Sequence, residues 1–174
     1  MVTDRNDIQL EPFIENAEAL FAKLWRYCDS ATVEEMAWTP TGIKNSPGWI
    51  LRHCAGLLWV TYGRMSSEPV PSSVQDSGIA WSSMKGTLFE DSEAALPQSA
   101  DDCLAYLDTA WSTLREYVEE ASAEWESRMI VFERKERSIW TFLSHQFADL
   151  AYHTGQASTL RKLLAVECRH SRHS

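Results

Sequence analysis

The chain has 174 residues with 16 basic and 25 acidic side chains, which gives a formal net charge of −9 at neutral pH. This length is typical of one domain with its own hydrophobic core, so we expect a single domain over residues 1–174. The acidic balance argues against a nucleic-acid-binding protein. Because there is neither an apolar run of membrane-spanning length nor a signal-peptide pattern, we expect a cytoplasmic protein without a membrane partner.

The first predicted helix covers about residues 10–29. Apolar residues recur there at three- and four-residue steps, from Phe13 to Cys28. That period is typical of an amphipathic helix with one buried face. The Thr-Pro-Thr-Gly sequence at 39–42 then predicts a turn-rich connection.

The second predicted helix begins at Pro47, because Ser46 is a suitable cap and proline suits the first helical position. Its apolar stripe includes Trp49, His53 and Met65. Residues 66–99 then follow neither a helical nor a strand period and contain three prolines and two glycines. A connection of this length is unusual in a compact domain and indicates a crossover loop.

Two further helices are expected. One starts near Ala100, with Ser99 as its cap, and has a strongly acidic outer face. The other runs from about Ser138 to Val166, and residues 167–174 are expected to be a frayed tail. Between the two helices, the apolar run at 129–132 is compatible with a short strand.

Four long amphipathic helices without a convincing sheet predict an all-α four-helix bundle with its core over about residues 10–166. The long connection between the second and third helices favours a bundle with one crossover. Trp25, Trp49, Trp111 and Trp140 fall at helical spacing with other apolar residues and are expected mostly to fill the core. The four cysteines form no CxxC pair and are expected to be buried and unpaired.

The last helix carries a histidine–aspartate–histidine series at four-residue steps, His145, Asp149 and His153. At about 100° per residue, His153 falls inside the apolar stripe, Asp149 at its edge and His145 towards the rim. His53 lies at the inward edge of the second helix. The inward polar set is therefore His53, Asp149 and His153.

Two neutral imidazoles and one carboxylate form an open site for a transition metal, with a position left for water or substrate. The spacing of Asp149 and His153 places two donors on one helix face, and His53 would come from another helix. The alternative is a hydrogen-bonded polar cluster in the core of a bundle without catalytic activity.

Two segments resemble the DinB-like superfamily of metal-binding four-helix bundles. WTPTGIKNSPGWILRHCAGLLW resembles the family's Trp-x-Pro followed by a capped helix with Trp-x3-His, and LSHQFADLAYHTGQASTLRKLL resembles its His-x3-His-x-Gly-Gln block. The resemblance covers about residues 10–166 and implies an up-down-down-up bundle. It also implies that His53 and His153 are metal ligands.

The middle ligand of the family falls on Asp149, where the commonest family residue is histidine. His145 is the substitute ligand if the helix is distorted, and Gln156 is expected as a donor behind the ligands. The resemblance implies a divalent ion, with zinc or nickel favoured.

Relatives in this superfamily include metal-dependent thiol transferases that use bacillithiol, mycothiol or glutathione. The resemblance thus implies a metal-activated nucleophile for thiol transfer, hydrolysis or isomerisation of a small-molecule substrate. If the chain is such an enzyme, we expect the 66–99 segment with Trp81 to cover the site. The alternative is a non-catalytic binding or stress-response bundle with a degenerate metal site. A homodimer through helix faces is compatible with both.

Overall fold

The computed structural model describes residues 10–43, 45–66, 99–120, 128–132 and 134–170 of the chain. This part of the chain forms four long helices, one short helix and a two-stranded hairpin. In chain order these are α1 (Leu10–Cys28), α2 (Val33–Ala37), α3 (Pro47–Ser66), α5 (Ala100–Glu120), β1 (Met129–Phe132), β2 (Lys135–Ser138) and α6 (Ile139–His170). The prediction of an all-α fold is confirmed.

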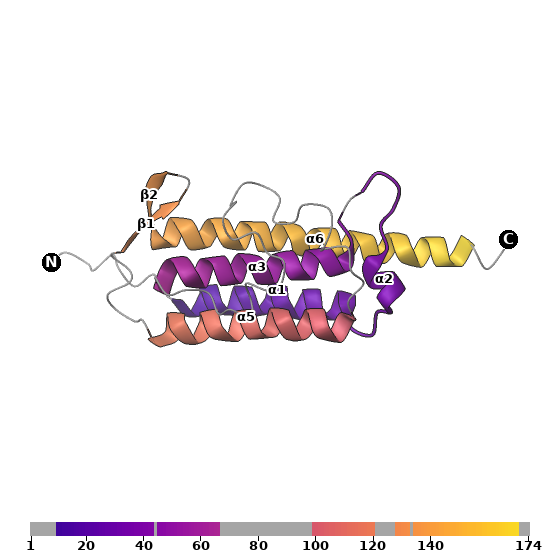
Figure 1. Ribbon diagram of the computed structural model, residues 1–174, viewed down its shortest axis with the longest axis horizontal. Helices are drawn as coiled ribbons and strands as arrows, with labels where there is room; N and C mark the ends of the chain where they lie inside the picture. Colours follow the sequence, from indigo (N-terminus) through magenta and orange to yellow (C-terminus); the bar gives the residue numbers. More distant parts are fainter. Residues whose placement is uncertain (1–9, 44, 67–98, 121–127, 133, 171–174) are drawn as a thin grey trace.

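The long helices lie side by side, with α1 and α6 running in one direction and α3 and α5 in the other (Figure 1). At one end of the bundle, Phe13 near the start of α1 packs against Phe147 near the start of α6, with ring centroids 4.1 Å apart. At the same end, the hydroxyl of Tyr117 near the end of α5 donates to the carbonyl of Met65 near the end of α3, at 2.7 Å. The up-down-down-up order is therefore confirmed.

Serine caps start α3 and α5 as predicted. The Oγ of Ser46 accepts a hydrogen bond from the backbone N–H of Trp49 at 3.2 Å, and the Oγ of Ser99 accepts from the N–H of Asp102 at 3.1 Å. Each serine thus satisfies one of the N–H groups that a helix leaves without a partner in its first turn. The Ser46 cap fixes the start of the helix that carries His53.

Helices α2 and α6 differ from the prediction. The turn-rich connection contains α2, whose capping residue Thr32 exchanges hydrogen bonds with Glu35. Helix α6 continues past the expected end at Val166 to His170, so only 171–174 of the expected tail lie beyond it, outside the described residues.

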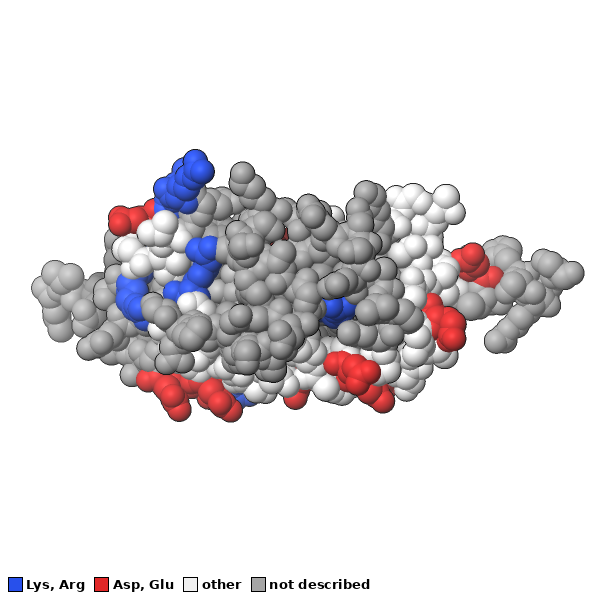
Figure 2. All heavy atoms as spheres, viewed as in Figure 1, with Lys and Arg blue, Asp and Glu red and all other residues white. Residues whose placement is uncertain are grey.

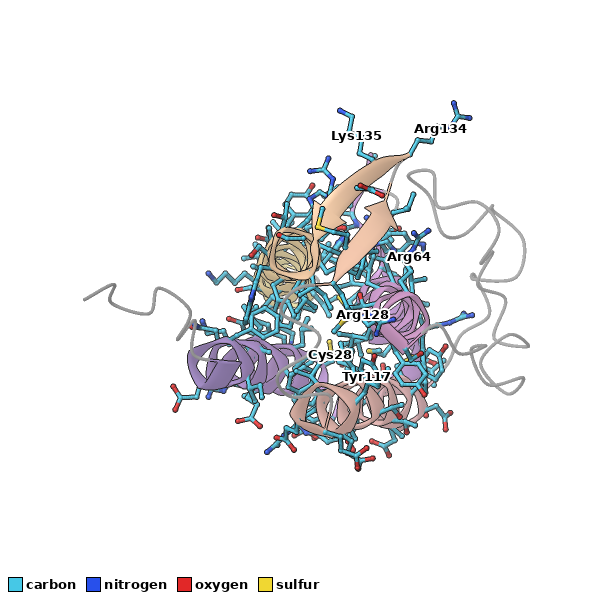
Figure 3. All side chains as sticks on the ribbon, turned by 90° about the vertical axis from the view of Figure 1, so that its left-hand side faces the viewer. Cys28, Arg64, Tyr117, Arg128, Arg134 and Lys135 are labelled. Carbon is cyan, nitrogen blue, oxygen red and sulfur yellow. The ribbon has the colours of Figure 1, made fainter. Side chains whose placement is uncertain are left out.

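The short strand expected at β1 is present and pairs antiparallel with β2, with Val131 opposite Glu136. Two arginines fasten this hairpin to the bundle, since Arg64 of α3 donates to the Val131 carbonyl at 2.7 Å and Arg128 donates to the carbonyl of Met65 at 2.8 Å. In the end-on view (Figure 3), Arg128 lies beside Tyr117, whereas the tip of the hairpin points away from the bundle.

The core lies between the four long helices. Helix α5 buries an apolar stripe that includes Leu104, Trp111 and Val118, and α3 is buried on nearly every side. Cys28, Cys54 and Cys103 are buried and unpaired as expected, and burial raises the pKa of Cys28 to about 12. The expectation for the tryptophans was wrong for Trp25, which is 45% exposed, whereas Trp111 is buried.

Acidic side chains line the edge of the molecule where α5 lies, while lysine and arginine gather near the hairpin (Figure 2). The acidic outer face expected for α5 is thus present, with Asp108, Glu116 and Glu119 all exposed. Among the described helices, none is long and apolar enough to cross a membrane.

Candidate metal centre

The structure brings together the three inward polar residues of the sequence analysis. Helix α3 supplies His53, and α6 supplies Asp149 and His153. Each offers one ligand atom, and these three atoms all lie within 4.8 Å of one another. The site therefore joins two helices that the long crossover and α5 separate in the sequence.

Burial distinguishes His145 from His53 and His153. The His53 and His153 side chains are each 6% exposed, whereas His145 is exposed and lies outside the group. Asp149 is partly buried, which matches its predicted place at the edge of the apolar stripe. The four-residue steps along α6 thus turn Asp149 and His153 towards α3 and leave His145 at the rim.

His53 is held between two rings. The Trp49 indole, one turn earlier on α3, stacks on its imidazole with centroids 4.6 Å apart and planes 10° apart. The His153 ring meets it edge-on at 4.4 Å. Burial, and secondarily the nearby His153, lower the pKa of His53 to about 3. At neutral pH its ring is therefore uncharged, which is the form that binds metal ions.

His153 is fixed by a hydrogen bond from its own helix. Its Nδ1 lies 2.8 Å from Oε1 of Gln156, and Nε2 of Gln156 donates to the hydroxyl of Tyr152 at 2.9 Å. Gln156 was expected as a donor behind the ligands, but its carbonyl oxygen faces His153 and accepts. This arrangement leaves Nε2 of His153 available to a ligand.

The donor set fits a divalent transition metal ion. Nδ1 of His53 is buried and has no hydrogen-bond partner among the described residues, which is unusual for a buried polar atom. Two nitrogens and one carboxylate oxygen are ligands that zinc accepts, at about 2.0–2.2 Å each. Histidine is the commonest residue at this position in the family that the sequence resembles. The shorter side chain of Asp149 still places a carboxylate oxygen close to the ligand atoms of His53 and His153.

The sequence analysis missed two residues of this site. Trp49 was assigned only to the core, and Tyr152 was not singled out. The signal was present for both, because Trp49 precedes His53 and Tyr152 precedes Gln156 by four residues. The expected cover, residues 66–99 with Trp81, falls almost entirely outside the described residues.

The comparison with family models covers most of the chain. The model of the DinB superfamily matches residues 16–157, which include all three candidate ligands. The match confirms the resemblance found in the sequence.

A similar fold occurs in a crystal structure described as that of a conserved protein from Enterococcus faecalis. The two chains superpose with a TM-score of 0.71 and 18% sequence identity, over 89% of this chain and 96% of the other. At this identity the likeness concerns the fold alone. No curated protein matches the chain.

Proposed function

The chain belongs to the DinB superfamily, and we propose that it binds a divalent metal ion, zinc or nickel, through His53, Asp149 and His153. The observation that carries the proposal is that one ligand atom from each residue lies within 4.8 Å of the other two. His53 and His153 would supply neutral nitrogens, and Asp149 would supply negative charge. Three protein ligands leave a position open to a small molecule, as in catalytic zinc sites.

We further propose that the site activates a nucleophile. A bound divalent ion lowers the pKa of a thiol or of water, so that thiolate or hydroxide is available at neutral pH. The proposed reaction is the transfer of a low-molecular-weight thiol to a small electrophile, or the hydrolysis or isomerisation of a small substrate. The chain's own residues orient the site, since Trp49 stacks on His53 and Gln156 holds His153.

The alternative is a non-catalytic bundle in which the same residues form a polar cluster. In such a cluster, hydrogen bonds within the group should satisfy the buried nitrogens, because a buried polar atom without a partner costs about 1–3 kcal/mol. Nδ1 of His53 has no such partner among the described residues. This observation favours a metal-binding site over a structural cluster.

Metal content tests the proposal. The purified, tag-free chain is loaded with zinc, dialysed and measured by elemental mass spectrometry, beside His153→Ala, Asp149→Ala and the control His145→Ala. We expect near-stoichiometric metal in the wild type and in the control, and its loss in the other two. A wild type without metal after loading, or equal metal in all four proteins, contradicts the proposal.

A screen of thiols and electrophiles then tests the reaction. The zinc-loaded and nickel-loaded wild type are assayed with bacillithiol, mycothiol and glutathione, and any activity is compared with that of His153→Ala. Loss of activity in that variant supports the proposed role of the metal, and full activity contradicts it. Light scattering on the same preparations tests the homodimer, which stays a prediction.

A further inference from the structure

A chain of hydrogen bonds leads from the candidate metal centre to the surface of α6. Nδ1 of the buried His153 contacts Oε1 of Gln156 at 2.8 Å, and Nε2 of Gln156 contacts the Tyr152 hydroxyl at 2.9 Å. The Tyr152 side chain is 61% exposed, and its ring lies edge-on against the His153 ring with centroids 5.1 Å apart. Neither Tyr152 nor Gln156 belongs to the three candidate ligands.

The orientation of the Gln156 amide decides which nitrogen of His153 carries the proton. A carbonyl oxygen only accepts, so with Oε1 facing the ring the proton must lie on Nδ1, and Nε2 keeps its lone pair. If the amide were turned over, its N–H would donate to Nδ1 and the proton would lie on Nε2. A protonated Nε2 cannot bind a metal ion, so only one of the two orientations suits the site.

The Tyr152 hydroxyl binds the other end of this amide. Its oxygen accepts from the end of Gln156 that points away from His153, while its ring covers one edge of the imidazole. We propose that Gln156, held by Tyr152, is a positioning residue that keeps His153 in the Nδ1–H tautomer and Nε2 free for the metal ion. This inference rests on the proposed function, but the tautomer exists and is measurable without metal.

The first experiment reads the tautomer directly. Long-range proton–nitrogen correlation spectra are recorded on the metal-free, full-length chain labelled with ¹⁵N in histidine, at a pH above the ordinary pKa of histidine. We expect the Nδ1–H form of His153 in the wild type and a shift towards Nε2–H in Gln156→Leu. Gln156→Glu should keep the Nδ1–H form, because a carboxylate only accepts. A wild type in the Nε2–H form, or no change in Gln156→Leu, overturns the inference.

Zinc affinity supplies the second readout, measured by competition with a coloured chelator. Loss of a partner behind a histidine ligand typically weakens metal binding about 10–100-fold, so we expect this range for Gln156→Leu and wild-type affinity or better for Gln156→Glu. Tyr152→Phe removes one hydrogen bond and should weaken binding about fivefold. The matched control, Tyr117→Phe at the hairpin end, should leave both readouts unchanged.

The two proposals fail in different ways. A wild type that binds no zinc contradicts the proposed function, while the tautomer spectra still test Gln156. Conversely, zinc binding that is equal in the wild type and Gln156→Leu overturns the positioning role and leaves the metal site intact. Melting curves of the metal-free variants check that each one is folded.

Discussion

The imidazole of His53 lies where its charged form is strongly disfavoured. Burial and the neighbouring His153 lower its pKa to about 3, against about 6.5 for an unfolded chain. Below pH 6.5 the unfolded chain therefore takes up a proton at His53 that the folded chain does not bind until about pH 3. The free energy of unfolding of the metal-free protein should fall as the pH falls through this window, by about 2 kcal/mol at pH 5.

Urea unfolding of the metal-free protein at pH 7 and pH 5 measures this effect. Other groups also titrate in this range. We therefore compare how much the free energy of unfolding decreases from pH 7 to pH 5 in the wild type and in His53→Gln, and we take the difference between the two decreases. We expect about 2 kcal/mol for this difference. His145→Gln, which changes an exposed histidine, should lose as much stability as the wild type. An equal loss in His53→Gln and the wild type would show that His53 is not held neutral.

At the scale of single residues, the sequence predicts the helix face on which a side chain lies better than it predicts the contacts of that side chain. The four-residue spacing was enough to place Asp149 beside His153 and His145 towards the rim, because helix geometry determines all three positions. The direction of the Gln156 amide and the stacking of Trp49 on His53 were not predicted. Both depend on which ring or hydroxyl lies next to the side chain in the folded helix, and a helical wheel carries only part of that information.

The start of α3 matters to the site because Ser46 caps the turn that contains Trp49. The Ser46 Oγ accepts from the Trp49 N–H, and the Trp49 ring stacks on His53. We expect Ser46→Ala to lower the free energy of unfolding by about 1 kcal/mol, which is typical for the loss of a capping hydroxyl. Fraying of this turn should also loosen His53 and weaken zinc binding.

Ser99→Ala is the matched control, since it removes the same kind of cap from α5, which carries none of the candidate ligands. Urea unfolding should show a similar loss of stability in both variants. Competition with a chelator should show weaker zinc binding in Ser46→Ala alone. Equal zinc affinity in the two variants would mean that the first turn of α3 does not position His53.

The long helices could be predicted from the sequence, whereas the short elements could not. Periodicity and serine caps located α3 and α5, because a helix of several turns repeats its apolar stripe often enough to be recognised. The five-residue α2 has no such repeat, although Thr32 and Glu35 form a capping box that could have revealed it. The partner strand β2 was missed because its sequence, KERS, is polar and gives no apolar alternation.

The order of the helices in the whole bundle follows from the long connection between α3 and α5. Two helices that lie on either side of this connection and run in the same direction need a chain segment long enough to return along the bundle. Composition and periodicity indicated a crossover, and the resemblance supplied the up-down-down-up order. Helical periodicity alone does not supply it, because it does not determine which helices become neighbours.

A metal ion at the candidate site would link α3 to α6, which lie far apart in the sequence, and it should therefore stabilise the whole bundle. A ligand that binds only the folded chain adds about 2.7 kcal/mol when its free concentration is 100 times its Kd. For a chain of this length, about 2–4 °C of Tm accompanies each kcal/mol, so zinc should raise Tm by about 5–10 °C.

Thermal unfolding at increasing zinc concentrations measures this shift. Asp149→Asn removes the charge of the carboxylate ligand, so most of the zinc-induced rise in Tm should disappear. Asp149→His introduces the residue that is commonest at this position in the family, so the rise in Tm should be retained. A similar rise in all three proteins would locate the stabilising zinc elsewhere on the chain. If zinc raises Tm in the wild type and in Asp149→His alone, position 149 needs a metal ligand and not a particular charge. Imidazole and carboxylate differ in charge, but each offers a lone pair to the metal ion.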